Sequence, residues 1–380
     1  MSNTMRIHRI VISGLMFLMF FGEGFAQDKK LQVFGFFQSA LSRNIAHSDG
    51  ILPNGAPLRF YERNYIHANT QQTNIFFRHE INSKFTAWLN IEMLNNFNTS
   101  QKWGSAKIEE AWGRFEIAKG TYIKAGKLIP AFNNFNEIKN RTPFLQYILR
   151  PPAYETAFSG FLPLDKFSPS DAFLQFTNQS NIGSLYIKTD VYVGNAEENF
   201  RTNEYTDEPI VTGTDTTDYL TVGGRLGVQY RSLNLGFSTV SDYENRNNVS
   251  ALRRWRIGTD FRFYINQFAF EGETIVVFYS TPDASELYNK LFYYGTIQYD
   301  FLEKFYLYTS YNFIQDKDYV YLKDGTKMYS FGGGIQIYDN VKFKMQVVDV
   351  QSIWQQPFFP ASIEINSTLR SFIAAISVMF

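Results

Sequence analysis

The chain has 380 residues, no cysteine, 36 basic and 36 acidic side chains, and an aromatic content of 18% that is dominated by Phe and Tyr. A balanced charge excludes the strongly basic surface by which proteins bind nucleic acid. Without cysteine there are no disulfides, and with only four histidines a zinc-type site is not expected. We therefore expect neither a cofactor nor a nucleic-acid partner.

The N-terminal segment, residues 1–26, has the pattern of a cleavable signal peptide. Arg6 and Arg9 form a short positive region, an apolar run follows at residues 10–21, and Gly24 and Ala26 place small residues before the expected cleavage point. The run is shorter than the roughly 20 residues that a membrane-spanning helix needs. We expect export, cleavage after Ala26, and a single domain over residues 27–380.

The rest of the sequence alternates with a period of two. Between Tyr219 and Arg231 every second residue is apolar or glycine, and the residues between them include charged and polar ones. This alternation lasts longer than the 5–6 residues of a usual soluble strand and suits a tilted strand that crosses a membrane. We expect about 16 strands, an even number. They are predicted at residues 31–43, 72–82, 84–95, 105–117, 121–129, 171–179, 184–194, 218–231, 233–242, 253–264, 267–279, 287–300, 304–315, 327–338, 341–351 and 367–380.

The links between these strands alternate in length. Those after even-numbered strands are short, as at Asn82-Ser83-Lys84 and Asp339-Asn340. Most of the others are long, namely residues 44–70, 96–104, 130–170, 195–217 and 352–366. Short periplasmic turns and long extracellular loops are typical of an outer-membrane barrel. The predicted fold is an all-β, antiparallel transmembrane β-barrel in the outer membrane of a Gram-negative bacterium, with lipid as its surroundings.

The last predicted strand ends on an aromatic residue. Phe372, Ile376, Val378 and Phe380 share one face of this strand with Ala374. The pattern resembles the terminal signal of outer-membrane barrels, and that resemblance implies recognition by the barrel-assembly machinery.

A barrel of about 16 strands leaves an aqueous channel, so charged strand faces are expected to line a wet lumen, where water removes the cost of burying charge. Aromatic clusters such as residues 34–37, 292–294 and 306–311 are expected to form girdles at the two membrane interfaces, with a lining of the lumen as the alternative. The predicted lumen-facing wall residues are Arg78, Glu80, Glu110, Arg114, Glu116, Lys124, Arg225, Arg254, Arg256 and Arg262.

The third long link, residues 130–170, is rich in Phe, Tyr and Pro. Apolar content of that density must be buried, and we expect the loop to fold into the barrel and narrow it. Its residues Glu137, Arg150 and Glu155 are expected to face the basic wall residues Arg78, Arg114 and Lys124. Opposed charges across a narrow pore create a transverse field that shapes ion preference. The alternative is that each is a wall charge solvated in a wide lumen.

Several short motifs resemble Gram-negative porins. These are residues 110–115 (EAWGRF), 122–127 (YIKAGK) and 130–132 (PAF), where a charged strand leads into a Pro-Phe step. Residues 140–144 and 150–154 are similar to the phosphate- and dicarboxylate-type porin superfamily. The resemblance implies a homotrimer with an inward-folded third loop. The loop lacks a dense array of Lys and Arg, which argues against phosphate selectivity.

The sequence therefore predicts a water-filled channel for passive diffusion of small hydrophilic solutes, with a preference for anions and organic acids. The alternatives are a substrate-specific barrel for oligosaccharides or aromatics, and a structural or adhesive barrel. After cleavage the histidines are His47, His67 and His79, and no serine partner is recognisable for His79. Enzymatic activity is not expected.

Overall fold

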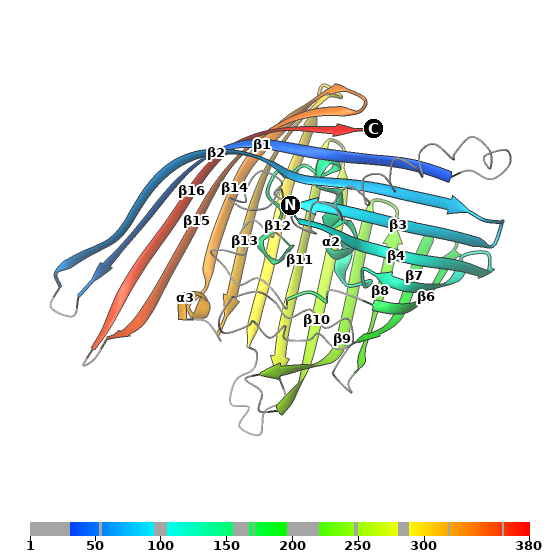
Figure 1. Ribbon diagram of the computed structural model, residues 1–380, viewed down its shortest axis with the longest axis horizontal. Helices are drawn as coiled ribbons and strands as arrows, with labels where there is room; N and C mark the ends of the chain where they lie inside the picture. The colour runs from blue at the N-terminus through cyan, green and yellow to red at the C-terminus, as the bar shows by residue number, and fades with distance from the viewer. Residues whose placement is uncertain are drawn as a thin grey trace, which may run out of the picture.

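The structure, a computed structural model, describes residues 31–52, 55–94, 105–154, 167–169, 172–195, 220–246, 250–279, 289–317, 320–358 and 361–380. They form a closed antiparallel barrel of 16 strands, in which each strand pairs with the next and β1 pairs with β16 (Figure 1). The predicted fold class is confirmed. The proposed signal peptide and Glu155 lie outside the described residues.

Each predicted strand overlaps one observed strand. The strands are β1 (Leu31–Ile51), β2 (Pro57–Glu80), β3 (Phe85–Leu94), β4 (Ser105–Ala118), β5 (Thr121–Leu128), β6 (Ala172–Ile182), β7 (Leu185–Asn195), β8 (Leu220–Tyr230), β9 (Leu233–Arg246), β10 (Ser250–Ile265), β11 (Phe268–Tyr279), β12 (Lys290–Phe301), β13 (Phe305–Asp316), β14 (Thr326–Tyr338), β15 (Val341–Phe358) and β16 (Ala361–Met379).

The turns after even-numbered strands are short, as predicted. Residues in the left-handed region allow these reversals, among them Gly183 (φ 61°), Arg231 (φ 53°) and Asn266 (φ 51°). Glycine and asparagine adopt positive φ more readily than most residues, which explains their place in such turns.

The prediction of long loops at residues 44–70 and 352–366 is wrong. Their chain instead prolongs β1, β2, β15 and β16, so that Ile45 pairs with both Asn64 and Arg370. Figure 1 shows these two hairpins running to the same end of the molecule. On the outer face of β15 and β16, next to residues 352–366, Asp349 pairs with Arg370 at 3.4 Å in place of apolar side chains. Alternation of apolar residues is needed only against lipid, so a strand with polar residues on both faces carries little of that signal.

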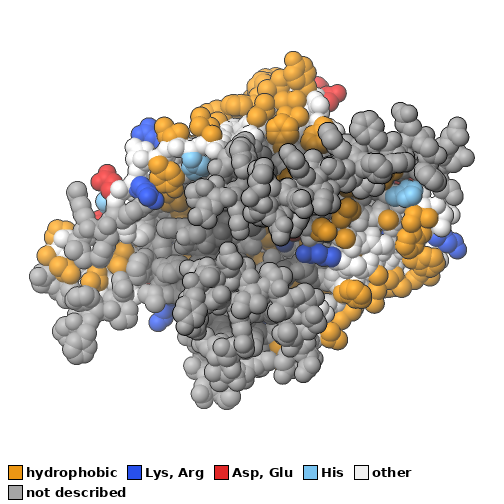
Figure 2. Space-filling model, viewed as in Figure 1, with side chains coloured by type: hydrophobic (Ala, Val, Ile, Leu, Met, Phe, Trp, Pro, Cys, Tyr) orange, Lys and Arg blue, Asp and Glu red, His pale blue; other side chains and the backbone are white. Residues whose placement is uncertain are grey.

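Within the barrel, side chains alternate between a buried interior and an apolar exterior. On β12, Thr296 is 3% exposed while its neighbour Ile297 is 45% exposed. On β7, Asp190 is 1% and Val191 is 51% exposed. Figure 2 shows hydrophobic side chains gathered along the flanks of the molecule. The exterior is thus the apolar face, and the polar and charged side chains gather in the interior.

The prediction that the aromatic clusters form girdles is wrong for several residues. Phe36, Phe292 and Tyr308 point inward and are at most 2% exposed. Each lies against a ring of the third loop, as Phe36 does against Phe144 with ring centroids 5.7 Å apart. These aromatics form the apolar core between the barrel wall and the loop, which the period-two pattern alone cannot distinguish from an interface girdle.

The helical elements are short: α2 (Asn133–Ile138), η1 (Lys139–Phe144), η2 (Pro152–Tyr154) and α3 (Val320–Lys323). No helix among the described residues has the length and apolar character to cross a membrane. The first three belong to the third loop, and α2 lies within the ring of strands in Figure 1.

Candidate functional site: the loop inside the barrel

The third loop begins by docking α2 against β9, β10 and β11. The backbone N–H of Asn133 donates to Ser238 Oγ at 2.9 Å, and that of Phe135 donates to the carboxyl group of Glu273 at 2.6 Å. Gly258 lies beneath this contact, where an added Cβ would stand 2.2 Å from Asn133 Oδ1. Glycine is therefore required at that point for the loop to approach the wall so closely.

The second half of the loop is held by β11, β12 and β15. The hydroxyl of Tyr147 donates to Glu271 at 2.5 Å, and its oxygen lies 2.7 Å from the hydroxyl of Thr296. The side-chain oxygen of Gln346 accepts the backbone N–H groups of Ile148 and Leu149 at 2.9 and 2.8 Å. Hydrogen bonds of this kind satisfy backbone groups that no strand or helix pairs.

The loop also reaches β2 and β4. The side chain of Gln72 donates to the carbonyl oxygen of Asn140 at 3.3 Å, and Asn140 donates to Glu109 at 3.0 Å. Contacts to walls on different sides mean that the loop crosses the interior. The predicted inward fold of residues 130–170 agrees with this for residues 130–154 and 167–169, which are the described part.

Most charges of the interior are neutralised by direct ion pairs. Arg225 binds Asp260 at 2.7 Å, and Arg254 and Arg256 share Asp242 at 2.6 and 2.9 Å. The other pairs are Arg78 with Glu80, Lys107 with Glu92 and Glu109, Lys188 with Glu137 and Asp190, Arg262 with Glu271, and Lys290 with Asp316.

The side chains of Arg254 and Arg256 are 0% exposed, so the expectation that they line a wet lumen is wrong. The carboxylate of Asp242, which both share, takes the place of water beside them, as burial of charge requires.

Three charges on the wall of β4 and β5 stand apart from this pattern. Within the described residues, Glu110, Arg114 and Lys124 have no ion pair. Glu110 instead accepts the indole N–H groups of Trp112 and Trp88 at 3.1 and 3.4 Å.

The two cations lie over aromatic rings. The ammonium of Lys124 is 4.8 Å from the ring centroid of Trp112, and the guanidinium of Arg114 is 5.3 Å from that of Tyr122. Contacts of this type attract a cation without cancelling its charge. The β4–β5 wall therefore presents both signs of charge to the interior.

The loop residues meet partners other than those expected. Glu137 lies 3.0 Å from Lys188, a residue that the sequence did not single out. Arg150 is 4% exposed and donates to the carbonyl oxygen of Lys139 at 2.7 Å, within the loop itself. Arg78 pairs with Glu80 on its own strand. Of the oppositions expected across the pore, the one between Glu137 and Lys124 is present as an attraction without direct contact, and the wall residue Arg225 attracts Glu137 in the same way.

The sequence also missed the residues that anchor the loop. Ser238, Glu271, Glu273 and Gln346 lie on inward strand faces, and the alternating pattern could have identified each as inward. Their contacts with the loop depend on a loop conformation that the pattern does not encode.

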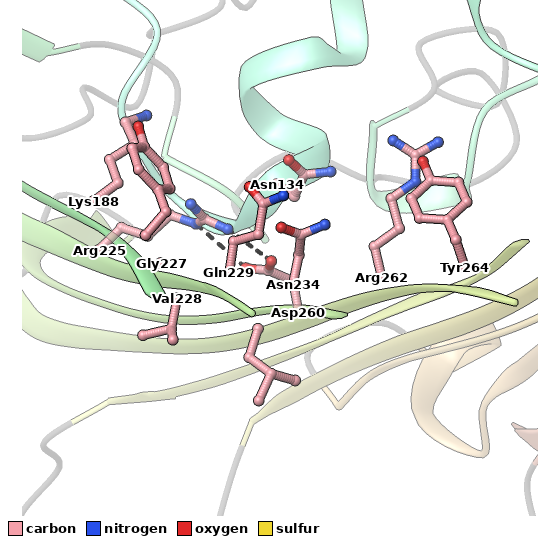
Figure 3. Close-up of a pocket in the computed structure, with 12 residues that line it drawn as sticks. Asn134, Lys188, Arg225, Gly227, Val228, Gln229, Asn234, Asp260, Arg262 and Tyr264 are labelled. Carbon is pink, nitrogen blue, oxygen red and sulfur yellow. Dashed lines mark hydrogen bonds and ion pairs between the residues drawn. The ribbon is translucent and has the colours of Figure 1, made fainter. Parts of the chain in front are cut away.

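Beside α2 the interior holds a pocket of ≈ 220 Å³ (Figure 3). Asn134 enters it from α2, and Lys188, Arg225 and Arg262 line it from the strands. Figure 3 shows Arg225 bonded to Asp260, while Val228 points to the opposite side of the sheet. Because these cations have carboxylate partners, the pocket offers little uncompensated charge.

His67 has polar neighbours on the inner face of the extended strands. Ser42 Oγ lies 3.1 Å from His67 Nε2 and 3.2 Å from Nδ1, and Asn44 Nδ2 lies 3.4 Å from Nδ1. A hydroxyl equidistant from both ring nitrogens is not directed at the lone pair of either, as a nucleophile–base pair requires. The described residues also contain no group of three or more His, Asp or Glu that could hold a metal ion.

No protein-family model and no curated protein matches the sequence. Solved structures of similar fold include the outer membrane channel DcaP of Acinetobacter baumannii, at 12% identity over 93% of this chain and 97% of that chain, with a TM-score of 0.56. Another is an anion-selective porin from Comamonas acidovorans, at 8% identity over 93% and 100% of the two chains, with a TM-score of 0.56. A third is the trimer form of OmpT, an outer membrane protein of Vibrio cholerae, at 8% identity, 93% and 100% coverage, and a TM-score of 0.53. The chain thus has the fold of outer-membrane porins, and the resemblance predicted from its motifs is confirmed at the level of the fold.

Proposed function

We propose that this chain is an outer-membrane porin of a Gram-negative bacterium, and that its interior is a water-filled channel for passive diffusion of small hydrophilic solutes. The observation that carries the proposal is the unpaired state of Glu110, Arg114 and Lys124 beside the inward loop. An unpaired charge in a dry interior would cost several kcal/mol. Such charges are stable where water reaches them, which a channel along the β4–β5 wall provides.

The outer-membrane location is supported by the exterior of the barrel. Exposed apolar residues such as Phe237, Phe331 and Met345 (50%, 57% and 60% exposed) are spread over its strands. Apolar side chains are stable in contact with the apolar lipid chains. A closed barrel also leaves no unpaired strand edge in the bilayer. Lipid is therefore the proposed partner of this surface.

We propose a mild preference for anions and organic acids. Arg114 and Lys124 supply two cations to the β4–β5 wall near the loop, against the single carboxylate of Glu110. Glu116 also faces inward on β4, but it lies two residues beyond Arg114 toward the turn after β4 and so farther from the loop. The reversal potential under a salt gradient measures the preference directly.

Three further assignments belong to the same proposal. Residues 1–26 direct export and are removed, so N-terminal sequencing of the mature protein should begin at Gln27. The outward face of Phe372, Ile376, Val378 and Phe380 is the signal read by the assembly machinery. The protein forms a homotrimer, which cross-linking of the detergent-purified protein would reveal as a three-subunit species.

Liposome swelling tests the function. Vesicles containing the purified protein should swell in isotonic solutions of small sugars, with rates that fall as the sugar becomes larger. Vesicles carrying heat-denatured protein are the control. Folded protein that gives no more swelling than this control would contradict the proposal.

A further inference from the structure

The β4–β5 wall keeps opposite charges close without letting them pair. In many other places of the described interior opposite charges lie in direct contact, as Lys188 and Glu137 do at 3.0 Å. Here Glu110 and Lys124 both contact the same side chain, Trp112, yet form no ion pair with each other.

Trp112 serves the two groups with different parts of its ring. Its edge donates the N–H to Glu110 at 3.1 Å, and its face receives Lys124 at 4.8 Å. An indole has only this one donor, and its face carries the negative end of the ring quadrupole. Each part therefore suits the charge that it meets.

The indole is held in this position by its neighbours. Trp88 is its cross-strand partner on β3 and stacks on it with ring centroids 5.7 Å apart and planes 17° apart. Phe76 lies behind Trp88 at 5.3 Å. Because rings from three consecutive strands pack in a row, Trp112 cannot turn aside to let Glu110 and Lys124 meet.

Gly126 makes room for this arrangement on the other side. It is the partner of Trp112 on β5, with φ 125°, and an added Cβ would lie 2.9 Å from the Cα of Trp112. Only glycine adopts this conformation without strain. The two strands approach closely here, which places Lys124 over the indole.

We propose that Trp112 is a spacer that keeps Glu110 and Lys124 unneutralised, and that the three form a subsite for amphoteric solutes carrying both an ammonium and a carboxylate group. The ammonium of such a solute binds Glu110, and its carboxylate binds Lys124. A solute with one charge satisfies only one of the two wall groups. This inference rests on the proposed function, because the solute reaches the wall through the channel.

The experiment compares three solutes that share a phenyl ring: phenylalanine, 3-phenylpropionate and phenethylamine. Each is added to single channels in a planar bilayer at neutral pH, and the concentration that halves the current is measured. We expect phenylalanine to block at a concentration lower by about tenfold than either singly charged analogue, the difference that one additional charged contact supplies.

Two variants distinguish the role of the Trp112 ring as a spacer from the role of its N–H as a hydrogen-bond donor. Trp112→Leu removes both the ring and the N–H, allows Glu110 and Lys124 to pair, and should abolish the preference for phenylalanine. Trp112→Phe keeps a ring between the charges and should retain most of the preference. The matched control is Trp255→Leu on β10, a tryptophan stacked with Arg253 at 4.5 Å rather than with the residues of this site. It should behave as the wild type.

An open wild-type channel that the three solutes block equally would overturn the subsite and leave the porin function standing. So would a Trp112→Leu channel that keeps the preference. If the folded wild type passes no current, the proposed function fails instead. Calorimetric binding of phenylalanine and its two analogues to the detergent-purified protein then decides the subsite separately, and equal or absent binding would refute it.

Discussion

The hydroxyl of Tyr154 donates a hydrogen bond of 2.7 Å to the carboxyl group of Glu273 on β11, 119 residues further along the chain. The other oxygen of Glu273 accepts the backbone N–H of Phe135 at 2.6 Å. A single buried carboxyl group thus binds the loop at two places, near the start of residues 130–154 and at their end. We therefore expect the position of the loop, and with it the width of the proposed channel, to change when this residue is replaced.

Replacing Glu273 should loosen the loop. In Glu273→Leu the hydroxyl of Tyr154 and the N–H of Phe135 lose their acceptor, at a cost of about 1–3 kcal/mol for each buried group. We expect a barrel that folds but gives noisier single-channel currents with additional, larger levels. The control is Glu364→Leu on the exposed part of β16, which should give wild-type currents. Wild-type noise in both variants would mean that Glu273 is not an anchor.

A steric test addresses the same contact from the wall. Gly258→Leu places a side chain where Asn133 and Phe132 now lie, within 2.9 Å of an added Cβ. Overpacking of this kind costs about 1–3 kcal/mol and should displace α2. Single-channel conductance is expected to change. Gly295→Leu on β12 is the matched control, since an added Cβ there meets nothing within 4 Å. Equal conductance in the two variants would contradict the docked position of α2.

The proposed anion preference makes Lys124 the residue to neutralise. A unit charge about 4 Å from a passing ion is worth about 1 kcal/mol in water, so Lys124→Gln should lower the anion-to-cation permeability ratio a few-fold. The reversal potential under a salt gradient gives this ratio. Lys84→Gln, in the turn between β2 and β3, is the control and should leave it unchanged. A shift of the same size in the control would place selectivity outside the β4–β5 wall.

The Glu137–Lys188 pair predicts the acid behaviour of the loop. Burial alone would raise the pKa of Glu137, but Lys188 and Arg225 outweigh burial and hold it below the ordinary value of 4.5. A carboxyl group with a lowered pKa stabilises the folded state above its ordinary value and loses that contribution as the pH falls through the lowered value. The part of the current noise that depends on Glu137 should therefore stay constant from neutral pH to 4.5 and rise below it. In Glu137→Gln the acid-dependent rise should be absent; a rise of equal size would assign it to another group.

Breaking the buried charge cluster should destabilise the whole barrel. Asp242→Asn removes the carboxylate shared by Arg254 and Arg256, and loss of one partner in a buried pair costs about 3–5 kcal/mol. The temperature at which the barrel unfolds in detergent should fall. Asp349→Asn breaks the more exposed pair with Arg370, worth at most about 1 kcal/mol, and should shift it little. Similar shifts in both would show that the cluster at Asp242 is not dry.

The strands could be predicted from the sequence because contact with lipid imposes a period of two. Residues 44–51 could not be predicted as a strand in this way. They lie beyond the apolar band of the barrel, where backbone pairing with β2 and β16 holds the strand without any apolar pattern. The ion-pair partners of the charged residues could not be predicted from the sequence either. Glu137 and Lys188 are 51 residues apart, and their contact needs both the strand register and the loop conformation. The stack of Trp88 on Trp112 follows from the pairing of β3 with β4, which no local pattern specifies.

Single-channel recording of the purified, folded protein in a planar bilayer is the most direct test of the channel itself. We expect large, steady current steps, grouped in threes for the proposed trimer, and a reversal potential that reports a mild anion preference. A protein that shifts in gel mobility on heating, as a folded barrel does, but gives no current steps would contradict it, because the loop would then close the lumen.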